Sequence, residues 1–316
     1  MEKFNLIMIS AMYENGGNTT HRHLDGHPEL FVYPFESQVG TGFGSDFLSS
    51  YVPIRYRWPE FPIEGDAAED YELFWDEELK TLLRAPGRSK FRDSGLVMDE
   101  AARRRRFVEI ANTLGRSRRN LVEAFFRSTF DTWSNYNTTG AEKYYVGYNP
   151  VQVLDTDKIL ADFPDGHVIH VIRNPYAGFA DQFRRPFPPS LHRYAHTWAY
   201  AQMLALTYQQ QYPGHFHIVR FEDLVSQKAS VMNGLQDALG IGRSDTMLYP
   251  SFNGQELKNI VPWGTIRTAT AEENVATARE LSADQQAQIA AITHVPHRIF
   301  GYDNFLAGGE ISPIAW

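Results

Sequence analysis

Residues 4–20 of the chain read FNLIMISAMYENGGNTT. The apolar run at residues 4–9 is nearly continuous and ends at Ser10, which is the pattern of a buried central strand in a parallel sheet. A glycine-rich loop and a short helix-like stretch follow, and Pro28 prevents the helix from continuing. The order of strand, glycine loop and helix decides the fold that we expect for the whole chain.

The rest of the chain alternates between strand and helix patterns. We expect further strands at residues 144–148, 167–172 and 217–221, and helices at 155–162, 191–211, 224–239 and 283–293. Residues 41–140 instead carry clustered charges and helix-like blocks, around 71–84, 98–111 and 116–133. The alternation predicts an α/β fold of three layers, with a central parallel sheet flanked by helices. We expect a single domain over residues 1–316, with a helical insertion at about 41–140.

The composition of the chain limits its classes of function. With 43% hydrophobic and 14% aromatic residues, its 316 residues can bury a large core. The formal net charge of −8 argues against a nucleic-acid partner, which needs a basic surface. Cysteine is absent, which excludes disulfides and thiolate metal sites and is typical of a chain that needs no oxidising compartment. No apolar stretch approaches the length of a membrane span, so we expect a cytoplasmic, bacterial protein without a membrane partner.

The loop after the first strand has the features of a phosphate site. Successive backbone N–H groups and the positive end of a helix dipole attract phosphate oxygens, and threonine hydroxyls add further donors. No lysine follows a glycine here, and Glu14 brings a negative charge, so the loop differs from the P-loops that hydrolyse ATP or GTP. The residues that we expect to contact phosphate are Gly16, Gly17, Asn18, Thr19 and Thr20.

Three stretches of the sequence resemble the PAPS-dependent sulfotransferase family. Residues 10–30 (SAMYENGGNTTHRHLDGHPEL) are similar to the family's loop for the donor's 5′-phosphosulfate. Residues 163–184 (FPDGHVIHVIRNPYAGFADQFR) are similar to its strand and turn for the 3′-phosphate, and residues 218–225 (IVRFEDLV) resemble its Arg-Tyr-Glu-Asp-Leu segment. The resemblance implies the P-loop-NTPase-like sulfotransferase fold, with PAPS as donor, PAP as the product left from it, and no metal.

The resemblance also implies roles for single residues. Arg173 is expected to bind the 3′-phosphate, at the carboxyl edge of the sheet, where a guanidinium can clamp a phosphate with two hydrogen bonds. Asp181 stands where the family has a serine, and it suits a phosphate site only if Arg184 or Arg185 neutralises it. Phe221 replaces the family's tyrosine beside the adenine. The late loop that closes over the nucleotide is expected to contain Trp263, Gly264 and Arg267.

The sequence offers several candidates for the catalytic groups. Sulfuryl transfer needs a base for the acceptor's proton and a positive group at the leaving phosphate. Glu36 is one candidate base, because aromatic neighbours would raise its pKa toward neutrality. His21 and His23 are rival bases, and Arg22 or either histidine is a candidate to replace the loop lysine that this chain lacks. The two histidines are two residues apart on a helix and diverge, which argues against a metal site.

The predicted function is transfer of a sulfuryl group from PAPS to a hydroxyl or amine of a small-molecule or carbohydrate acceptor. Residues 41–140 are expected to form the acceptor side, and their many aromatic residues suit a sugar or an aromatic acceptor. Two alternatives stay open: a degenerate family member that binds a nucleotide or a partner without turnover, and a P-loop kinase, for which the loop is unsuitable. A homodimer is compatible with the sequence.

Overall fold

The computed structural model describes residues 3–43, 46–258 and 270–308. The strands of its central sheet are β1 (Leu6–Ala11), β2 (Leu30–Val32), β3 (Tyr144–Pro150), β4 (His167–Ile172) and β5 (Phe216–Arg220). They lie in the order β2-β3-β1-β4-β5, and every neighbouring pair is parallel. The parallel sheet confirms the α/β fold expected from the sequence.

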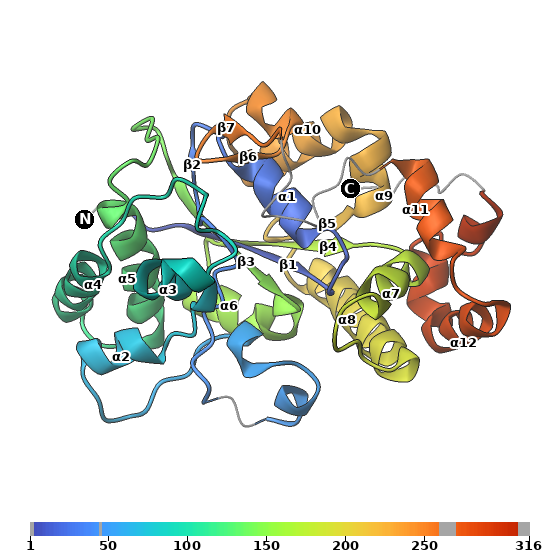
Figure 1. The fold of residues 1–316 in the computed structure, drawn as a ribbon, viewed down its shortest axis with the longest axis horizontal. Coiled ribbons are helices and arrows are strands. Elements are labelled where there is room, and N and C mark those ends of the chain that lie inside the picture. The colour runs from blue at the N-terminus through green and yellow to red at the C-terminus, as the bar shows by residue number, and fades with distance from the viewer. Residues whose placement is uncertain (1–2, 44–45, 259–269, 309–316) are drawn as a thin grey trace.

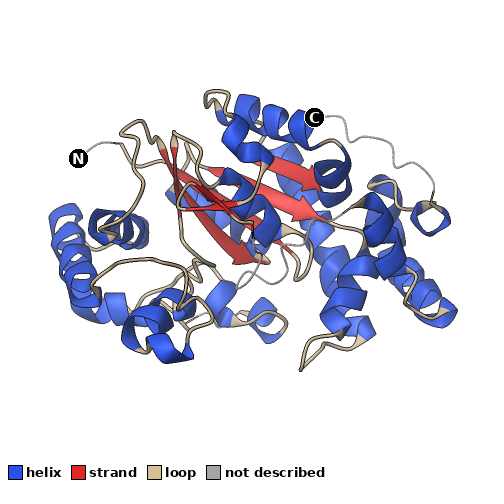
Figure 2. Ribbon diagram, turned by 45° about the horizontal axis from the view of Figure 1, so that its top comes forward, coloured by secondary structure: helices blue, strands red, loops and turns tan. Residues whose placement is uncertain are grey.

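Helices surround this sheet, as Figures 1 and 2 show. In chain order they are α1 (Gly17–Leu24), α2 (Ala67–Leu73), α3 (Glu77–Arg84), α4 (Glu100–Leu114), α5 (Arg118–Thr132), α6 (Thr156–Asp162), α7 (Pro175–Phe183), α8 (Leu191–Gln211), α9 (Phe221–Ser226), α10 (Lys228–Leu239), α11 (Ala271–Ala278) and α12 (Ala283–Ile299). A short hairpin is formed by β6 (Ser251–Phe252) and β7 (Gln255–Glu256). Over the described ranges, none of the helices has the length and apolarity to cross a membrane.

Alternate residues of the central strand face the two sides of the sheet. Ile7 and Ile9 join a core with side chains of α1, α9 and α10, whereas Leu6 and Met8 join a second core with α5 and α8. All four side chains are fully buried, and burial of each contributes about 1.5–3 kcal/mol to stability. Figure 1 shows α1 and α10 above the sheet and α8 below it. The two cores therefore produce the three layers that the alternation predicted.

Residues 41–140 contain α2 to α5, and a buried network connects them to the sheet. Arg103 of α4 is fully buried, where its Nη1 donates to Asp76 Oδ2 at 2.5 Å and its Nη2 donates to the Tyr33 hydroxyl at 3.0 Å. The Tyr33 hydroxyl in turn donates to Asp76 Oδ1 at 2.7 Å. A buried ion pair is tolerated when such hydrogen bonds satisfy both partners. The network therefore holds the helical segment against the residues that follow β2.

Three expected helix boundaries are wrong. The block at 71–84 is two helices, because Asp76 has a left-handed φ of 39° and donates its N–H to the carbonyl of Gln38 at 3.0 Å. The helix expected at 224–239 is divided between α9 and α10 at Gln227, where φ is −134°. Helix α12 extends to Ile299, past the expected end at residue 293, although Pro296 lies inside it. Tertiary contacts set these boundaries more strongly than local propensity does.

Candidate functional site

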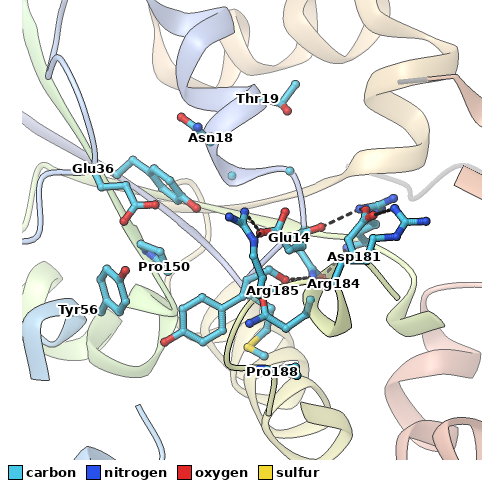
Figure 3. Close-up of a pocket in the computed structure, with 18 of the residues that line it drawn as sticks. Glu14, Asn18, Thr19, Glu36, Tyr56, Pro150, Asp181, Arg184, Arg185 and Pro188 are labelled. Atoms are coloured by element: carbon cyan, nitrogen blue, oxygen red, sulfur yellow. Dashed lines mark hydrogen bonds and ion pairs between the residues drawn. The ribbon is translucent and has the colours of Figure 1, made fainter. Parts of the chain in front are cut away.

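A cleft of about 1380 Å³ opens at the carboxyl ends of the parallel strands. Each of the five strands leads into its lining, which includes Tyr13 after β1, Glu36 after β2, Pro150 of β3, Arg173 after β4 and Phe221 after β5. Figure 3 shows Glu36 and Tyr56 on one side of the cleft and Asp181 with Arg184 on the other. This edge of the sheet is where α/β folds bind their ligands.

Close contacts on both sides shape the glycine loop. Gly16 has a φ of 87°, and a Cβ atom at this position would lie 2.3 Å from the ring of Phe221. A Cβ atom on Gly17 would lie 2.5 Å from the ring of Tyr148. Only glycine fits the conformation and the space at Gly16, and only glycine fits the space at Gly17. The loop therefore passes between two aromatic rings, and Gly16, Gly17, Asn18 and Thr19 all line the cleft. Their contact with phosphate stays a prediction.

The remaining residues expected in this region do not line the described cleft. Thr20 is buried, and its hydroxyl donates to the carbonyl of Gly16 at 3.1 Å. Arg22 is fully buried, its Nη2 donates to a backbone carbonyl at 2.9 Å, and burial lowers its pKa to about 10. His21 and His23 are also buried, and burial lowers the pKa of both imidazoles. We therefore leave His21, Arg22 and His23 out of the chemistry proposed for the cleft.

Glu36 lines the cleft with a raised pKa. Burial, followed by the negative charge of Glu78, raises the pKa of Glu36 to about 7. The Glu36 N–H donates to Glu78 Oε2 at 3.0 Å, and Lys90 pairs with Glu78 Oε1 at 2.6 Å. The charge of Lys90 and hydrogen bonds from Gln38 and Tyr56 keep the pKa of Glu36 from rising further. A carboxylate that is half ionised near neutral pH suits general base catalysis, which stays a prediction.

Arg173 lies just past β4 and contacts other parts of the protein. Its Nε donates to Asn274 Oδ1, and its Nη1 donates to the carbonyl of Glu14 and to Asp181 Oδ2, each at 2.8 Å. The guanidinium carbon lies 5.2 Å from the centre of the Phe221 ring. No described residue accepts a hydrogen bond from its Nη2. Arg173 therefore keeps donor capacity for a ligand, although an internal carboxylate already binds it.

Further ion pairs surround Arg173. Asp181 Oδ1 accepts from Arg184 Nη1 at 2.8 Å, and Arg184 Nη2 pairs with Glu280. Arg185 donates through Nε to Glu14 Oε1 at 2.8 Å and also through Nη2. The sequence left open which arginine neutralises Asp181. The structure assigns Arg184 to Asp181, and Arg185 to Glu14.

Glu222 fixes the turn that carries Arg173. Its Oε1 accepts from the Asn174 N–H at 3.0 Å, from Asn174 Nδ2 at 2.8 Å and from Asn274 Nδ2 at 2.9 Å. Its Oε2 accepts from the Tyr302 hydroxyl at 2.9 Å. This carboxylate, in the stretch at 218–225, thus connects the end of β4 with α9 and α11. Hydrogen bonds to a buried carboxylate contribute more than neutral ones, so the turn is held firmly.

Two polar groups of the cleft wall are buried without a hydrogen-bond partner among the described residues: the Tyr13 hydroxyl and Arg55 Nε. The ring of Tyr13 lies 5.9 Å from that of Tyr56. An unsatisfied buried polar group costs about 1–3 kcal/mol, so both groups are candidates to bind an acceptor. Sequence reasoning missed them, because only the density of aromatic residues in 41–140 pointed to this wall.

Some expected residues cannot be placed in the cleft. Trp263, Gly264 and Arg267 lie outside the described residues. In the part of the chain that the structure describes, no three histidine, aspartate or glutamate side chains gather as metal ligands do.

Comparisons with known proteins identify the family. The sequence matches the model of the sulfotransferase family over residues 64–245, which is more than half of the chain. The fold is similar to the sulfotransferase domain of the olefin synthase from Synechococcus PCC 7002, with a TM-score of 0.56, 16% identity, and coverage of 92% of this chain and 96% of that one. It is also similar to the sulfotransferase domain from the curacin biosynthetic pathway, with a TM-score of 0.52, 16% identity, and coverage of 92% and 98%. No curated protein matches the sequence. The chain belongs to the sulfotransferase family.

Proposed function

We propose that this protein transfers a sulfuryl group from PAPS to a hydroxyl or amine of a small-molecule or carbohydrate acceptor. The observation that carries the proposal is Glu36, a carboxylate with a pKa of about 7 in the same cleft as the glycine loop. Family membership supports the reaction class, and in this proposal Glu36 is the base and the glycine loop binds phosphate.

The donor half of the cleft suits a nucleotide with charged groups at two positions. The start of α1 offers backbone donors and the positive end of a helix dipole to the 5′-phosphosulfate. Figure 3 shows Arg184 across the cleft from Glu36, and Arg173 lies near Arg184 because both pair with Asp181. In this proposal both guanidinium groups bind the 3′-phosphate. Phe221 supports both parts, because its ring contacts the loop at Gly16 and lies against Arg173.

In this proposal Glu36 takes the proton of the acceptor while the acceptor oxygen or nitrogen attacks sulfur. A bond from the acceptor atom to sulfur forms, the bond from sulfur to the leaving phosphate oxygen breaks, and that oxygen keeps the electron pair. Backbone donors of residues 16–19 stabilise the charge that develops on the leaving group. Glu36 must be ionised to act, so the rate is expected to rise with pH through about 7.

The acceptor half of the cleft is polar and lies beside Glu36. The Tyr13 hydroxyl and Arg55 Nε offer unpaired donors, and Glu77 and Glu78 line the same cleft. Because Arg55, Glu77 and Glu78 belong to the segment 41–140, we propose that this segment forms the acceptor side. An acceptor with several hydroxyl groups, such as a carbohydrate, satisfies donors and carboxylates of this kind.

Two measurements test the proposal. Titration calorimetry with PAP tests the donor half, and absence of heat from PAP binding would contradict it. Transfer of radiolabelled sulfate from PAPS, screened over sugars, alcohols and amines, tests turnover. Glu36→Gln is expected to abolish transfer and retain PAP binding, whereas the control Glu256→Gln, an exposed position in β7, is expected to retain both.

A second candidate is a family member that binds a nucleotide or a partner without turnover. The observation that favours it is the absence of a lysine from the glycine loop, together with the pairing of Arg173, Arg184 and Arg185 to carboxylates. Label transfer that depends on Glu36 excludes this candidate.

A further inference from the structure

The carboxylate of Asp181 lies between two arginines at the donor side of the cleft. Its Oδ2 pairs with Arg173 Nη1 and its Oδ1 with Arg184 Nη1, each at 2.8 Å. The Arg173 side chain is 10% exposed and that of Asp181 20%, so the pair is largely shielded from water. The single carboxylate of Asp181 therefore forms ion pairs with both guanidinium groups.

Local structure gives no reason for an acid at this position. Asp181 lies in the last turn of α7 (Pro175–Phe183), where the negative end of the helix dipole disfavours a carboxylate. Its hydrogen bonds are made to the two arginines and to neither helix end. Its contacts with the two arginines therefore explain why a carboxylate lies at this position, and all three side chains line the cleft.

The surrounding charges leave no surplus for a phosphate. Arg184 also pairs with Glu280, and Arg185 pairs with Glu14. Three guanidinium groups (Arg173, Arg184 and Arg185) are thus matched by three carboxylates (Asp181, Glu280 and Glu14). A phosphate dianion that approaches Arg173 meets a neutral network with a carboxylate at its centre, and like charges a few ångströms apart repel strongly when shielded from water.

We propose that Asp181 sets the donor specificity of this protein: its carboxylate competes with a nucleotide 3′-phosphate for Arg173 and Arg184. The inference rests on the proposed function, in which these arginines face the 3′-phosphate. The competition weakens binding of nucleotides with a 3′-phosphate and leaves nucleotides without one unaffected. The chain therefore distinguishes the two kinds of nucleotide less than its arginines alone allow.

Titration calorimetry with PAP and AMP tests this proposal, because the two nucleotides differ only in the 3′-phosphate. Asp181→Asn removes the charge and keeps the shape, and Asp181→Ser also makes room. Both variants are expected to bind PAP about tenfold or more tighter than the unmodified protein, with AMP affinity changed less than about threefold. Asp237→Asn is the matched control, since it disrupts the Asp237–Arg243 pair outside the cleft, and it is expected to change neither affinity.

The outcomes separate the inference from the function. If the unmodified protein binds PAP and both Asp181 variants bind it equally or more weakly, Asp181 positions Arg173 and the inference is overturned, while the proposed function stands. If PAP and AMP affinities rise by the same factor, the competition is not with the 3′-phosphate, and the inference again fails. If none of the proteins binds PAP, the proposed function fails together with the inference.

Discussion

Replacing Glu78 with glutamine removes one negative charge beside Glu36 and keeps most of the local structure. The glutamine side-chain oxygen can still accept the Glu36 N–H, a bond of 3.0 Å in this protein. Lys90 loses its partner at 2.6 Å, but it is exposed and can turn to solvent. The substitution therefore isolates the electrostatic influence of Glu78 on the pKa of Glu36.

The size of the effect follows from the causes of the raised pKa. The pKa of Glu36 rises from an ordinary value of 4.5 to about 7, with burial as the largest cause and Glu78 as the second. Glu78 thus raises the pKa of Glu36 less than burial does, and Glu78→Gln is expected to lower this pKa by about one pH unit. If Glu36 is the base, the rising limb of the pH–rate profile moves down by the same amount.

Carbon NMR of glutamate carboxyl groups measures this pKa directly over about pH 4 to 9, with Glu36→Gln used to assign the signal. The pH dependence of sulfate transfer provides the second readout. Glu77→Gln is the control, because Glu77 lines the same cleft but pairs with Arg55 and is absent from the causes of the shift. A Glu36 midpoint that stays unchanged or rises in Glu78→Gln would refute the reasoning.

Three further predictions concern stability and the loop. The raised pKa of Glu36 makes folding less favourable as the pH rises from 4.5 to about 7, because the folded protein holds the proton more tightly than the unfolded chain. Glu36→Gln should therefore raise the free energy of unfolding in urea by about 2 kcal/mol at pH 8 and leave it unchanged at pH 4. Gly16→Ala should lower the free energy of unfolding by about 2 kcal/mol or more and weaken PAP binding. The control Gly234→Ala, in open space inside α10, should raise the free energy of unfolding by about 0.5–1 kcal/mol. Equal effects of the two substitutions in unfolding experiments would contradict the role given to the loop. Burial lowers the pKa of four imidazoles from 6.5 to about 4; these belong to His23, His167, His170 and His217. Between pH 6.5 and 4 the unfolded chain therefore binds more protons than the folded one, and the free energy of unfolding should fall as the pH drops. A free energy of unfolding that stays constant over this pH range would contradict the prediction.

The parts of the fold that the sequence predicted are those with a continuous local signal. The strands β1, β4 and β5 are fully buried and therefore appear as apolar or mostly apolar runs. The break at Asp76 has no such signal, because it depends on a carbonyl of residue 38 and on the distant Arg103. The strand β2 has only three residues, too few for a periodic pattern to show.

The candidate site also has features with a local sequence signal and features that depend on distant residues. The position of residues 16–19 and of Arg173 in the cleft was predictable, because both segments come soon after a recognisable strand. The charge that helps to raise the pKa of Glu36 was not, since Glu78 is 42 residues away and reaches Glu36 only through the fold. Arg22 was expected to act in the cleft, because a charged residue in a polar stretch is rarely fully buried, but it is fully buried and does not line the described cleft.

The contacts of Arg173 also constrain how the site can arise during synthesis. Among the described residues, its guanidinium donates hydrogen bonds to Glu14 near the start of the chain, to Asp181 in the middle and to Asn274 near the end. A nascent chain can assemble the sheet once β5 has left the ribosome, but the guanidinium lacks its Asn274 contact until α11 has emerged. Donor binding by a ribosome-bound chain should therefore mature late, and a product that terminates between β5 and α11 should carry the glycine loop without a completed arginine site.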